Sequence, residues 1–305
     1  MITSRKLTMD TTGKLSGRSR FTAIFGDPVE HSLSPAMHNA AYAALGMDRA
    51  YLAFHVTPEK LRGAIHAVAA LGLLGVNLTV PHKERALRMM AHLSAEARTL
   101  GAINCVVNRG GVLHGDNTDA RGLESDLRES GLELEGRLAV IVGAGGAAAA
   151  AVLAAIRLGA GRIVICNRTV PRANRLARRL AAYAGTRGGG RAHELIEARG
   201  LETLSRSGTL SAAALVVNAT PLGLKGGAFP AIEYAAAPAH CLFYDLIYAR
   251  ELTPFLKPAA ALGRRAMDGA GMLANQGALA FELFNETASP PGLMRATLMA
   301  ALGRE

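Results

Sequence analysis

The sequence has few cysteines, few aromatic residues and no tryptophan. Its three cysteines, Cys105, Cys166 and Cys241, are widely spaced and form no C-x-x-C pair, so they indicate neither a disulfide framework nor a cysteine-based zinc site. No H-E-x-x-H motif or Cys/His cluster indicates a catalytic metal, and we expect none. Unpaired cysteines of this kind favour a reducing compartment, and we expect a cytoplasmic protein.

Long apolar runs are also scarce. The exception is residues 138–156, which carry no charge and are long enough to span a membrane. The middle of this run is G-A-G-G followed by alanines, so a strand, a tight turn and a small-residue helix explain it better, and we expect no membrane partner. The basic N-terminus lacks the apolar core of a secretory signal, and residues 1–19 are interpreted as a disordered tail.

Positive charge is unevenly distributed in a chain whose formal net charge is +10. Residues 157–206 hold eleven arginines and only three acids. A basic balance raises the question of nucleic-acid binding, but neither interleaved aromatic residues nor zinc-finger spacing accompanies it. A phosphate-bearing small molecule is an equally good explanation. The motifs described below favour that explanation, so we expect no nucleic-acid partner.

Short apolar runs alternate with helical patterns along most of the 305 residues, a length that suggests two domains or one large one. We expect strands at residues 21–26, 50–56, 74–80, 102–108, 138–142, 162–166, 215–217 and 241–244. We expect helices at residues 35–45, 58–71, 83–90, 145–158, 171–182, 272–284 and 293–302, and a glycine-rich loop at 186–190. This alternation predicts an α/β fold with largely parallel sheets.

A glycine-rich turn stands between an expected strand and an expected helix. Gly143, Gly145 and Ala148 match the G-x-G-x-x-G/A pattern. The glycines let the backbone approach a pyrophosphate, and the helix N-terminus then faces the anion with free N–H groups. The strand before and the helix after make dinucleotide binding the favoured interpretation. The alternative is a tight strand-to-helix turn without a ligand.

The residues after the next strand bear on the choice of cofactor. An NAD site uses an acid ~20 residues after the glycines. This chain instead has Arg168 and Arg172, and its first acid after the turn is Glu194. Because a guanidinium can bind a 2′-phosphate, the pattern predicts NADP. The alternative is that both arginines are solvated charges at a helix start.

Two groups of polar residues in the first part of the chain are candidates for binding a substrate. Ser32 and Ser34 can donate to one carboxylate, although Ser34 could simply cap a helix that starts at Pro35. Asn77 and Thr79 share one face of a strand, and Lys83 follows where that strand ends. Open α/β sheets bind ligands at such strand ends. The alternative for Lys83 is a solvated surface lysine.

Two further candidates lie near expected helices. Asp119 ends the motif G-D-N-T-D and could cap the next helix or pair with Lys83. Gln276 lies on an apolar helix face, where its amide needs a partner. A hydroxylated ligand or the backbone could supply that partner.

The motifs H-S-x-S-P-x-M-H-N, G-x-N-x-T-V-P-x-K, G-A-x-N, G-D-N-T-D, G-A-G-G-A with N-R-T-x-x-R, N-A-T-P, Y-D-x-x-Y and M-L-x-x-Q occur in this order. Together, from about Phe21 to Phe284, they closely resemble the shikimate dehydrogenase family. The resemblance implies reversible NADPH reduction of 3-dehydroshikimate to shikimate, in chorismate and aromatic amino-acid biosynthesis. It also implies two lobes, an N-terminal α/β substrate-binding domain and a Rossmann-type NADP-binding domain, with a central cleft.

The resemblance assigns roles to individual residues. Lys83 and Asp119 are expected to be the catalytic pair, with Lys83 donating the proton during reduction. The substrate carboxylate is expected to bind Ser32, Ser34 and Tyr248, and the ring hydroxyls Thr79, Asn104, Asp119 and Gln276, with Asn77 in support. The NADP site is expected to comprise Gly143, Ala144, Gly145, Gly146, Ala147, Asn167, Arg168, Thr169, Arg172, Thr220, Leu246 and Gly269.

Departures from the family pattern are small. His82 stands where Phe is commoner, Cys105 where Thr is common, and Ala120 where Gly is common. One alternative is a dehydrogenase that also accepts quinate, but such relatives tend to carry Thr in place of Ser34 and an acid in place of Arg168. Another is a non-catalytic NADP-binding regulator, which the presence of both members of the catalytic pair disfavours.

The expected domain division follows from the same resemblance. Residues 20–118 and 270–305 form the substrate-binding domain, and residues 119–269 form the NADP-binding domain. The expected partner is a small molecule, shikimate or 3-dehydroshikimate, and the chain is expected to be a monomer or a homodimer.

Overall fold

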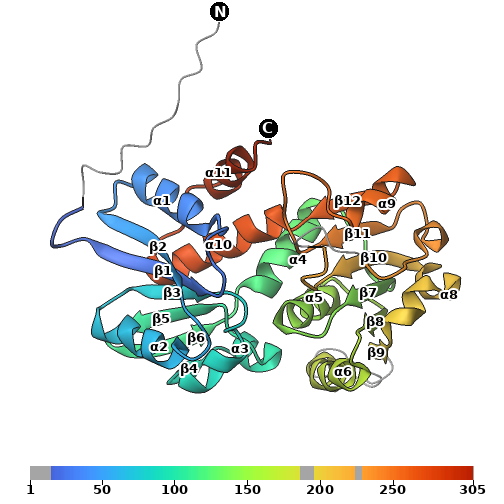
Figure 1. The fold of residues 1–305 in the computed structure, drawn as a ribbon, viewed down its shortest axis with the longest axis horizontal. Helices are drawn as coiled ribbons and strands as arrows, with labels where there is room; N and C mark the ends of the chain where they lie inside the picture. Colours follow the sequence, from blue (N-terminus) through green and yellow to red (C-terminus); the bar gives the residue numbers. More distant parts are fainter. Residues whose placement is uncertain (1–14, 186–195, 224–228, 305) are drawn as a thin grey trace, which may run out of the picture.

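A computed structural model describes residues 15–185, 196–223 and 229–304. Two six-stranded sheets lie on either side of a pair of helices, α4 (Asp119–Glu129) and α10 (Ala270–Asn285) (Figure 1). We call the halves the first lobe and the second lobe. The expected glycine-rich loop at 186–190 lies outside the described residues, as do residues 1–14 of the expected tail.

The sheet of the first lobe is mixed. Its strands are β1 (Arg20–Gly26), β2 (Arg49–His55), β3 (Gly75–Leu78), β4 (His92–Leu93), β5 (Cys105–Arg109) and β6 (Val112–Asp116), in the order β2-β1-β3-β5-β6-β4. β1 pairs in parallel with β2 and β3, but β5 runs antiparallel to β3 and β6. Because β6 runs the same way as β3 and pairs in parallel with β4, β5 alone among these six strands runs against the rest, and the expectation of a largely parallel sheet is confirmed. A hairpin turn at Gly110 and Gly111, both with positive φ, joins β5 to β6, a strand that was not among those expected.

Helices cover both faces of this sheet (Figure 1). They are α1 (Ser34–Ala44), α2 (Leu61–Ala70) and α3 (Ala95–Leu100), joined by the C-terminal α11 (Leu293–Ala301). The core between β1, α1, α10 and α11 includes Met37, Tyr42, Phe281 and Leu298. The helix expected at 83–90 is a 3-10 helix, η1 (Arg85–Met89), which begins later and leaves Lys83 in the turn after β3.

The sheet of the second lobe is entirely parallel. Its strands are β7 (Leu138–Val142), β8 (Arg162–Cys166), β9 (Ile196–Arg199), β10 (Ala213–Asn218), β11 (Leu242–Asp245) and β12 (Arg265–Asp268). In the order β12-β11-β10-β7-β8-β9, the chain adds β8 and β9 on one side of β7 and then β10, β11 and β12 on the other. The order in which strands are added therefore reverses between β7 and β10. Ligands of doubly wound sheets bind at such a reversal. The expected Rossmann-type domain is confirmed.

The helices and turns of the second lobe complete the layer on each side of its sheet. They are α5 (Gly146–Arg157), α6 (Val170–Gly185), η2 (Leu201–Ser205), α8 (Ser207–Leu210), η3 (Tyr234–Ala236) and α9 (Leu256–Ala261). The uncharged run 138–156 is β7, a turn and α5, as expected. Every residue of α5 from Ala148 to Ala155 is buried, because small side chains let the helix lie close to the sheet and to α4. No helix within the described ranges is both long and apolar enough to cross a membrane.

The connecting helices α4 and α10 approach each other closely. A Cβ atom on Gly122 of α4 would stand 2.7 Å from the Cβ atom of Gln276 of α10, so only glycine permits this crossing. Asp126 of α4 accepts hydrogen bonds from Tyr244 of β11 (2.6 Å) and Arg295 of α11 (2.9 Å). These contacts tie the crossing to both lobes.

One buried histidine has no hydrogen-bond partner within the described part of the chain. His38 of α1 is 1% exposed, and its ring stacks on Tyr51 at 4.1 Å between centroids. Burial lowers the pKa of His38 to about 3, so the folded protein holds the ring neutral.

We expect the free energy of unfolding of His38→Phe to fall less steeply than that of the wild type as the pH is lowered. The pKa of His38 in the folded chain lies below its ordinary value of 6.5, so its stabilising effect is complete above pH 6.5 and is lost as the pH falls toward 3. Below pH 6.5 the wild type should therefore lose on the order of 1 kcal/mol more per pH unit than the variant. Urea unfolding at several pH values measures this, with the exposed His66→Gln as control. Parallel profiles for wild type and His38→Phe would contradict the assignment.

Candidate active site

A cavity of about 200 Å³ lies between the two lobes. It is lined by all of the predicted substrate residues, which are Ser32, Ser34, Asn77, Thr79, Lys83, Asn104, Asp119, Tyr248 and Gln276. Three of the predicted cofactor residues also line it, namely Ala147, Leu246 and Gly269. Residues far apart in the sequence are therefore brought to one place.

An ion pair stands in the wall of this cavity. The Lys83 Nζ atom lies 2.6 Å from the Asp119 Oδ2 atom, and the two side chains are 22% and 5% exposed. Asp119 is the first residue of α4, where a negative charge interacts favourably with the helix dipole. An ammonium group has three donors, so Lys83 can bind Asp119 and still donate to a ligand.

Backbone contacts fix the turn that carries Lys83. β3 ends at Leu78, and the carbonyl of Lys83 accepts from the backbone N–H of Ile103 at 2.9 Å. The preceding residue, His82, is buried, and its Nε2 atom lies 2.7 Å from the carbonyl of Val56. Burial lowers the pKa of His82, so its neutral ring donates to that carbonyl and anchors the turn.

Amide side chains hold the carboxylate of Asp119. The Asn104 Nδ2 atom donates to Asp119 Oδ1 at 2.7 Å and lies within reach of Thr118 Oγ1 and Gln276 Oε1. The Gln276 Nε2 atom donates to the carbonyl of Leu273 at 3.0 Å. The backbone thus supplies a partner for the amide of Gln276, and the side chain also lines the cavity, where binding of a hydroxylated ligand stays a prediction.

Hydroxyl groups gather at another part of the cavity. Ser34 is the first residue of α1, and its cap position is Leu33, so the interpretation of Ser34 as the helix cap is wrong. The Ser32 Oγ atom accepts from the backbone N–H of Ser34 at 3.3 Å. Tyr248, from the second lobe, hydrogen-bonds the backbone of Leu33. Hydroxyls from both lobes therefore converge beside the start of α1.

Sequence reasoning missed Tyr51, which lies beneath these residues. Tyr51 is 1% exposed, and its hydroxyl donates to Asn77 Oδ1 at 2.7 Å and hydrogen-bonds Ser34. Asn77 in turn donates to the carbonyl of Asn104 at 3.0 Å. Alternation along β2 would not have identified Tyr51, because the apolar Leu52 and Phe54 lie on the other face of the strand and are exposed, and the partner of the Tyr51 hydroxyl is set by packing between strands.

The glycine turn of the second lobe meets Lys83 of the first. Gly143 has a φ of +121°, and a Cβ atom there would stand 2.9 Å from the carbonyl oxygen of Ala219. A Cβ atom on Gly146 would stand 4.0 Å from that of Lys83. No side chain caps the start of α5, so its first N–H groups are open to an anion. These observations fit a pyrophosphate held beside the ion pair.

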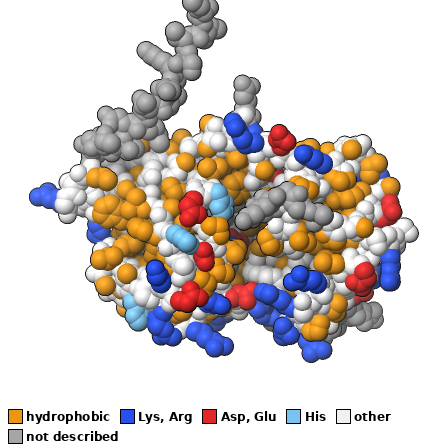
Figure 2. All heavy atoms as spheres, viewed as in Figure 1, with side chains coloured by type: hydrophobic (Ala, Val, Ile, Leu, Met, Phe, Trp, Pro, Cys, Tyr) orange, Lys and Arg blue, Asp and Glu red, His pale blue; other side chains and the backbone are white. Residues whose placement is uncertain are grey.

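Of the remaining predicted cofactor residues, Thr220 and Arg172 contact the turn. Thr220 Oγ1 donates to Asn218 Oδ1 at 2.7 Å, and the Thr220 methyl faces Gly143. Asn167 Nδ2 donates to the carbonyl of Thr169 at 3.0 Å, and Arg168 is exposed. Figure 2 shows Lys and Arg side chains along the lower edge of the molecule, where Figure 1 places α6. The second lobe thus presents cationic groups next to its glycine turn.

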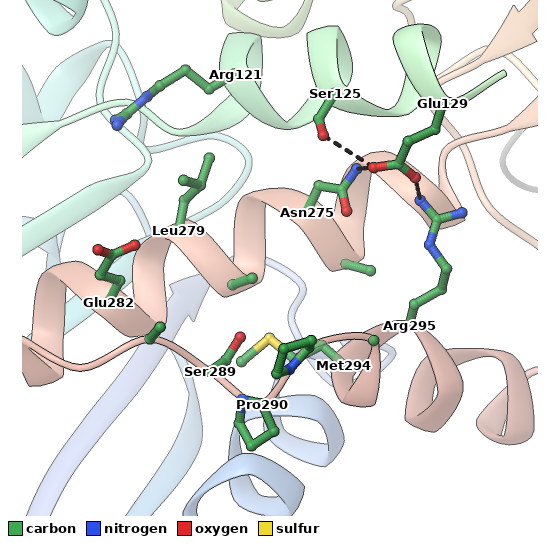
Figure 3. A pocket seen from close by; sticks show the side chains of 15 residues that line it. Arg121, Ser125, Glu129, Asn275, Leu279, Glu282, Ser289, Pro290, Met294 and Arg295 are labelled. Carbon is green, nitrogen blue, oxygen red and sulfur yellow. Dashed lines mark hydrogen bonds and ion pairs between the residues drawn. The ribbon is translucent and has the colours of Figure 1, made fainter. Parts of the chain in front are cut away.

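A larger open groove of about 540 Å³ lies between α4, α10 and the segment leading into α11 (Figure 3). None of the predicted substrate or cofactor residues lines it. Glu129 accepts hydrogen bonds there from Ser125, Asn275 and Arg295. Because these polar groups satisfy one another, the smaller cavity between the lobes is the better candidate. Within the described ranges, no group of three or more His, Cys, Asp or Glu residues could hold a metal ion.

Comparison with known proteins identifies related chains. Residues 24–106 match the shikimate dehydrogenase substrate binding domain, and residues 269–299 match the shikimate 5'-dehydrogenase C-terminal domain. The shikimate dehydrogenase (NADP(+)) of Symbiobacterium thermophilum is 42% identical, covering 94% of this chain and 96% of its own. That of Geobacter sp. (strain M21) is 41% identical, covering 94% and 97%.

Solved structures with the same fold include a shikimate dehydrogenase in complex with NADP+ (TM-score 0.85, 31% identity, covering 94% of this chain and 97% of that one). The enzyme from Thermus thermophilus in complex with NADP(H) and shikimate has a TM-score of 0.78 and 37% identity, covering 92% and 99%. A quinate dehydrogenase from Corynebacterium glutamicum in complex with NAD has a TM-score of 0.82 and 28% identity, covering 92% and 99%.

Proposed function

The chain belongs to the shikimate dehydrogenase family, and from this premise we propose that it reversibly reduces 3-dehydroshikimate to shikimate with NADPH. The observation that carries the proposal is the Lys83–Asp119 pair in the cavity beside the glycine turn. An absorbance assay of nicotinamide reduction, with shikimate or quinate against NADP+ or NAD+, tests it directly. Turnover is expected with shikimate and NADP+.

Proton transfer is assigned to Lys83. When bound, the nicotinamide supplies or accepts the hydride. Reduction of a ketone leaves negative charge on oxygen, and a positioned donor accelerates such a step by about 10²–10⁴-fold. The Lys83 Nζ atom donates the proton during reduction and accepts it during oxidation. Asp119 keeps the amine in place, because its own carboxylate is held by Asn104.

One group of residues binds the carboxylate of the substrate, and another binds its ring hydroxyls. Ser32, Ser34 and Tyr248 bind the carboxylate, since these hydroxyls lie together beside the start of α1. Thr79, Asn104, Asp119 and Gln276 bind the ring hydroxyls, with Asn77 in support. Hydroxyl and amide groups that converge on one small polar ligand support this division.

The cofactor is held by the second lobe. Its pyrophosphate is bound by the turn at 143–147, with Thr220, Leu246 and Gly269 around the nicotinamide end. Asn167, Arg168, Thr169 and Arg172 bind the adenosine end, and Arg168 takes the 2′-phosphate. The exposed guanidinium of Arg168 at the end of β8 supports this assignment.

Activity on quinate is the second candidate, since a quinate dehydrogenase shares the fold. Ser34 and Arg168 favour shikimate and NADP over that alternative. A non-catalytic regulator would have no use for the Lys83–Asp119 pair. We further propose the division of the chain at about residues 119 and 270, a cytoplasmic location, and a monomer or homodimer.

Lys83→Ala should lower kcat by about 10²-fold or more, because the proton donor is lost. Shikimate should still bind, with a Kd within a few-fold of the wild-type value. Stopped-flow and equilibrium titration measure the two quantities, with the exposed Lys60→Ala as control. Near-normal turnover of Lys83→Ala would remove this residue from the mechanism.

Arg168→Gln should weaken NADPH binding by ~1.5–3 kcal/mol, as expected for a lost charged hydrogen bond. Binding of NADH should change little, because NADH has no 2′-phosphate. Fluorescence titration of both cofactors provides the comparison, and Arg175→Gln on the exposed face of α6 is the matched control. Equal losses for NADPH and NADH would count against the 2′-phosphate assignment.

Tyr51→Phe should raise the KM for shikimate about three- to tenfold, because loss of a buried donor leaves Asn77 held only by its bond to the Asn104 carbonyl. The kcat and the KM for NADP+ should stay within about twofold, since Tyr51 touches neither reacting group. Tyr42→Phe is the control, because Tyr42 is also buried and its hydroxyl lies 2.8 Å from Thr22 Oγ1. Similar KM values for the two variants would show that Tyr51 has no positioning role.

A further inference from the structure

One exposed ion pair joins the two lobes beside the glycine turn. Glu84 follows Lys83 in the first lobe, and Arg172 lies on α6 of the second. A terminal nitrogen of Arg172 lies 3.1 Å from Glu84 Oε1, and Arg172 Nε donates to the carbonyl of Ala144 at 3.0 Å. A single guanidinium therefore contacts both the phosphate-binding turn and the opposite lobe.

This guanidinium lies over the turn itself. A terminal nitrogen of Arg172 is 3.8 Å from the point where a Cβ atom on Gly145 would stand. A guanidinium has more N–H groups than these two bonds use, and its planar edge suits phosphate as well as carboxylate. An anion entering the turn therefore meets Arg172 with Glu84 already bound to it.

The Glu84–Arg172 ion pair is weak enough for another anion to replace Glu84. The Glu84 and Arg172 side chains are 54% and 49% exposed, and exposed ion pairs are weak. A second pair between the lobes differs in this respect: Arg157 of α5 and Glu96 of α3 lie 2.9 Å apart and are only 17% and 11% exposed. The Arg157–Glu96 pair is a lasting link between the lobes, whereas the Glu84–Arg172 pair can open when a stronger anion competes.

We propose that Glu84 tunes cofactor affinity from the opposite lobe by competing with a cofactor phosphate for Arg172. Both the 2′-phosphate monoester and the pyrophosphate as a whole carry more negative charge than a carboxylate, so either can displace Glu84, and the displaced carboxylate then repels the phosphate nearby. This inference rests on the proposed function in that NADP is the cofactor. Glu84 is a positioning residue, because it acts through Arg172.

Glu84→Gln should bind NADP+ about three- to tenfold more tightly than the wild type, because the competing charge is removed. Calorimetric titration with NADP+ and NAD+ also identifies the competing phosphate. An unchanged Kd for NAD+ assigns the competition to the 2′-phosphate, and equal tightening of both assigns it to the pyrophosphate. The kcat with saturating shikimate should stay within about twofold. Unchanged or weaker NADP+ binding would overturn the proposal.

Two comparisons isolate the mechanism. Glu133→Gln removes the same charge from an exposed ion pair with Arg137 and should leave the Kd for NADP+ unchanged. In an Arg172→Gln background, Glu84→Gln should not change the Kd for NADP+, because the guanidinium for which Glu84 competes is absent. Equal tightening in that background would mean a general charge effect and would also overturn the proposal. Failure of the wild type to bind NADP+ would instead contradict the proposed function.

Discussion

The ion pair between Lys83 and Asp119 is the contact on which the site depends. Its two members lie on different elements: Lys83 in the turn after β3, and Asp119 in the first turn of α4. Each is fixed by its own backbone, through Ile103 and Asn117 respectively. The amine therefore has a defined position before any ligand arrives, which is the property that a proton donor in hydride-transfer chemistry requires.

Glycine and alanine residues shape the cleft as much as the polar groups that line it. Gly122 lets α10 bring Gln276 against α4, and Gly143 lets the glycine turn pass close to the carbonyl oxygen of Ala219. The alanines of α5 then let that helix lie close to the sheet behind it. A larger residue at any of these places would move a functional group relative to its partner. Glycine and alanine positions, which have no functional side chain, thus set the distances between the functional groups.

Most of the second lobe was predictable from sequence, because β7, the glycine turn and α5 are contiguous and each leaves a local pattern. The first lobe was less so. β5 runs antiparallel to both of its neighbours, and a strand assignment based on apolar runs passed over the turn at Gly110 and Gly111 and the strand β6 that follows it. Lys83 and Asp119 could be named from their motifs, and the domain limits remain predictions. The contacts of Tyr51 and of Glu84 could not be foreseen, since each joins segments that only the folded chain brings together.

The return of α10 and α11 to the first lobe has a consequence for biosynthesis on the ribosome. The apolar face of α1, with Met37 and Tyr42, is covered by Phe281, Met294 and Leu298, which are translated only after the whole second lobe. The nascent first lobe therefore emerges with that face open, while the second lobe holds most of its own core within one continuous stretch. Unfinished chains expose an aggregation-prone surface until α10 and α11 emerge, so translation speed and chaperone capture bear on the yield of active protein.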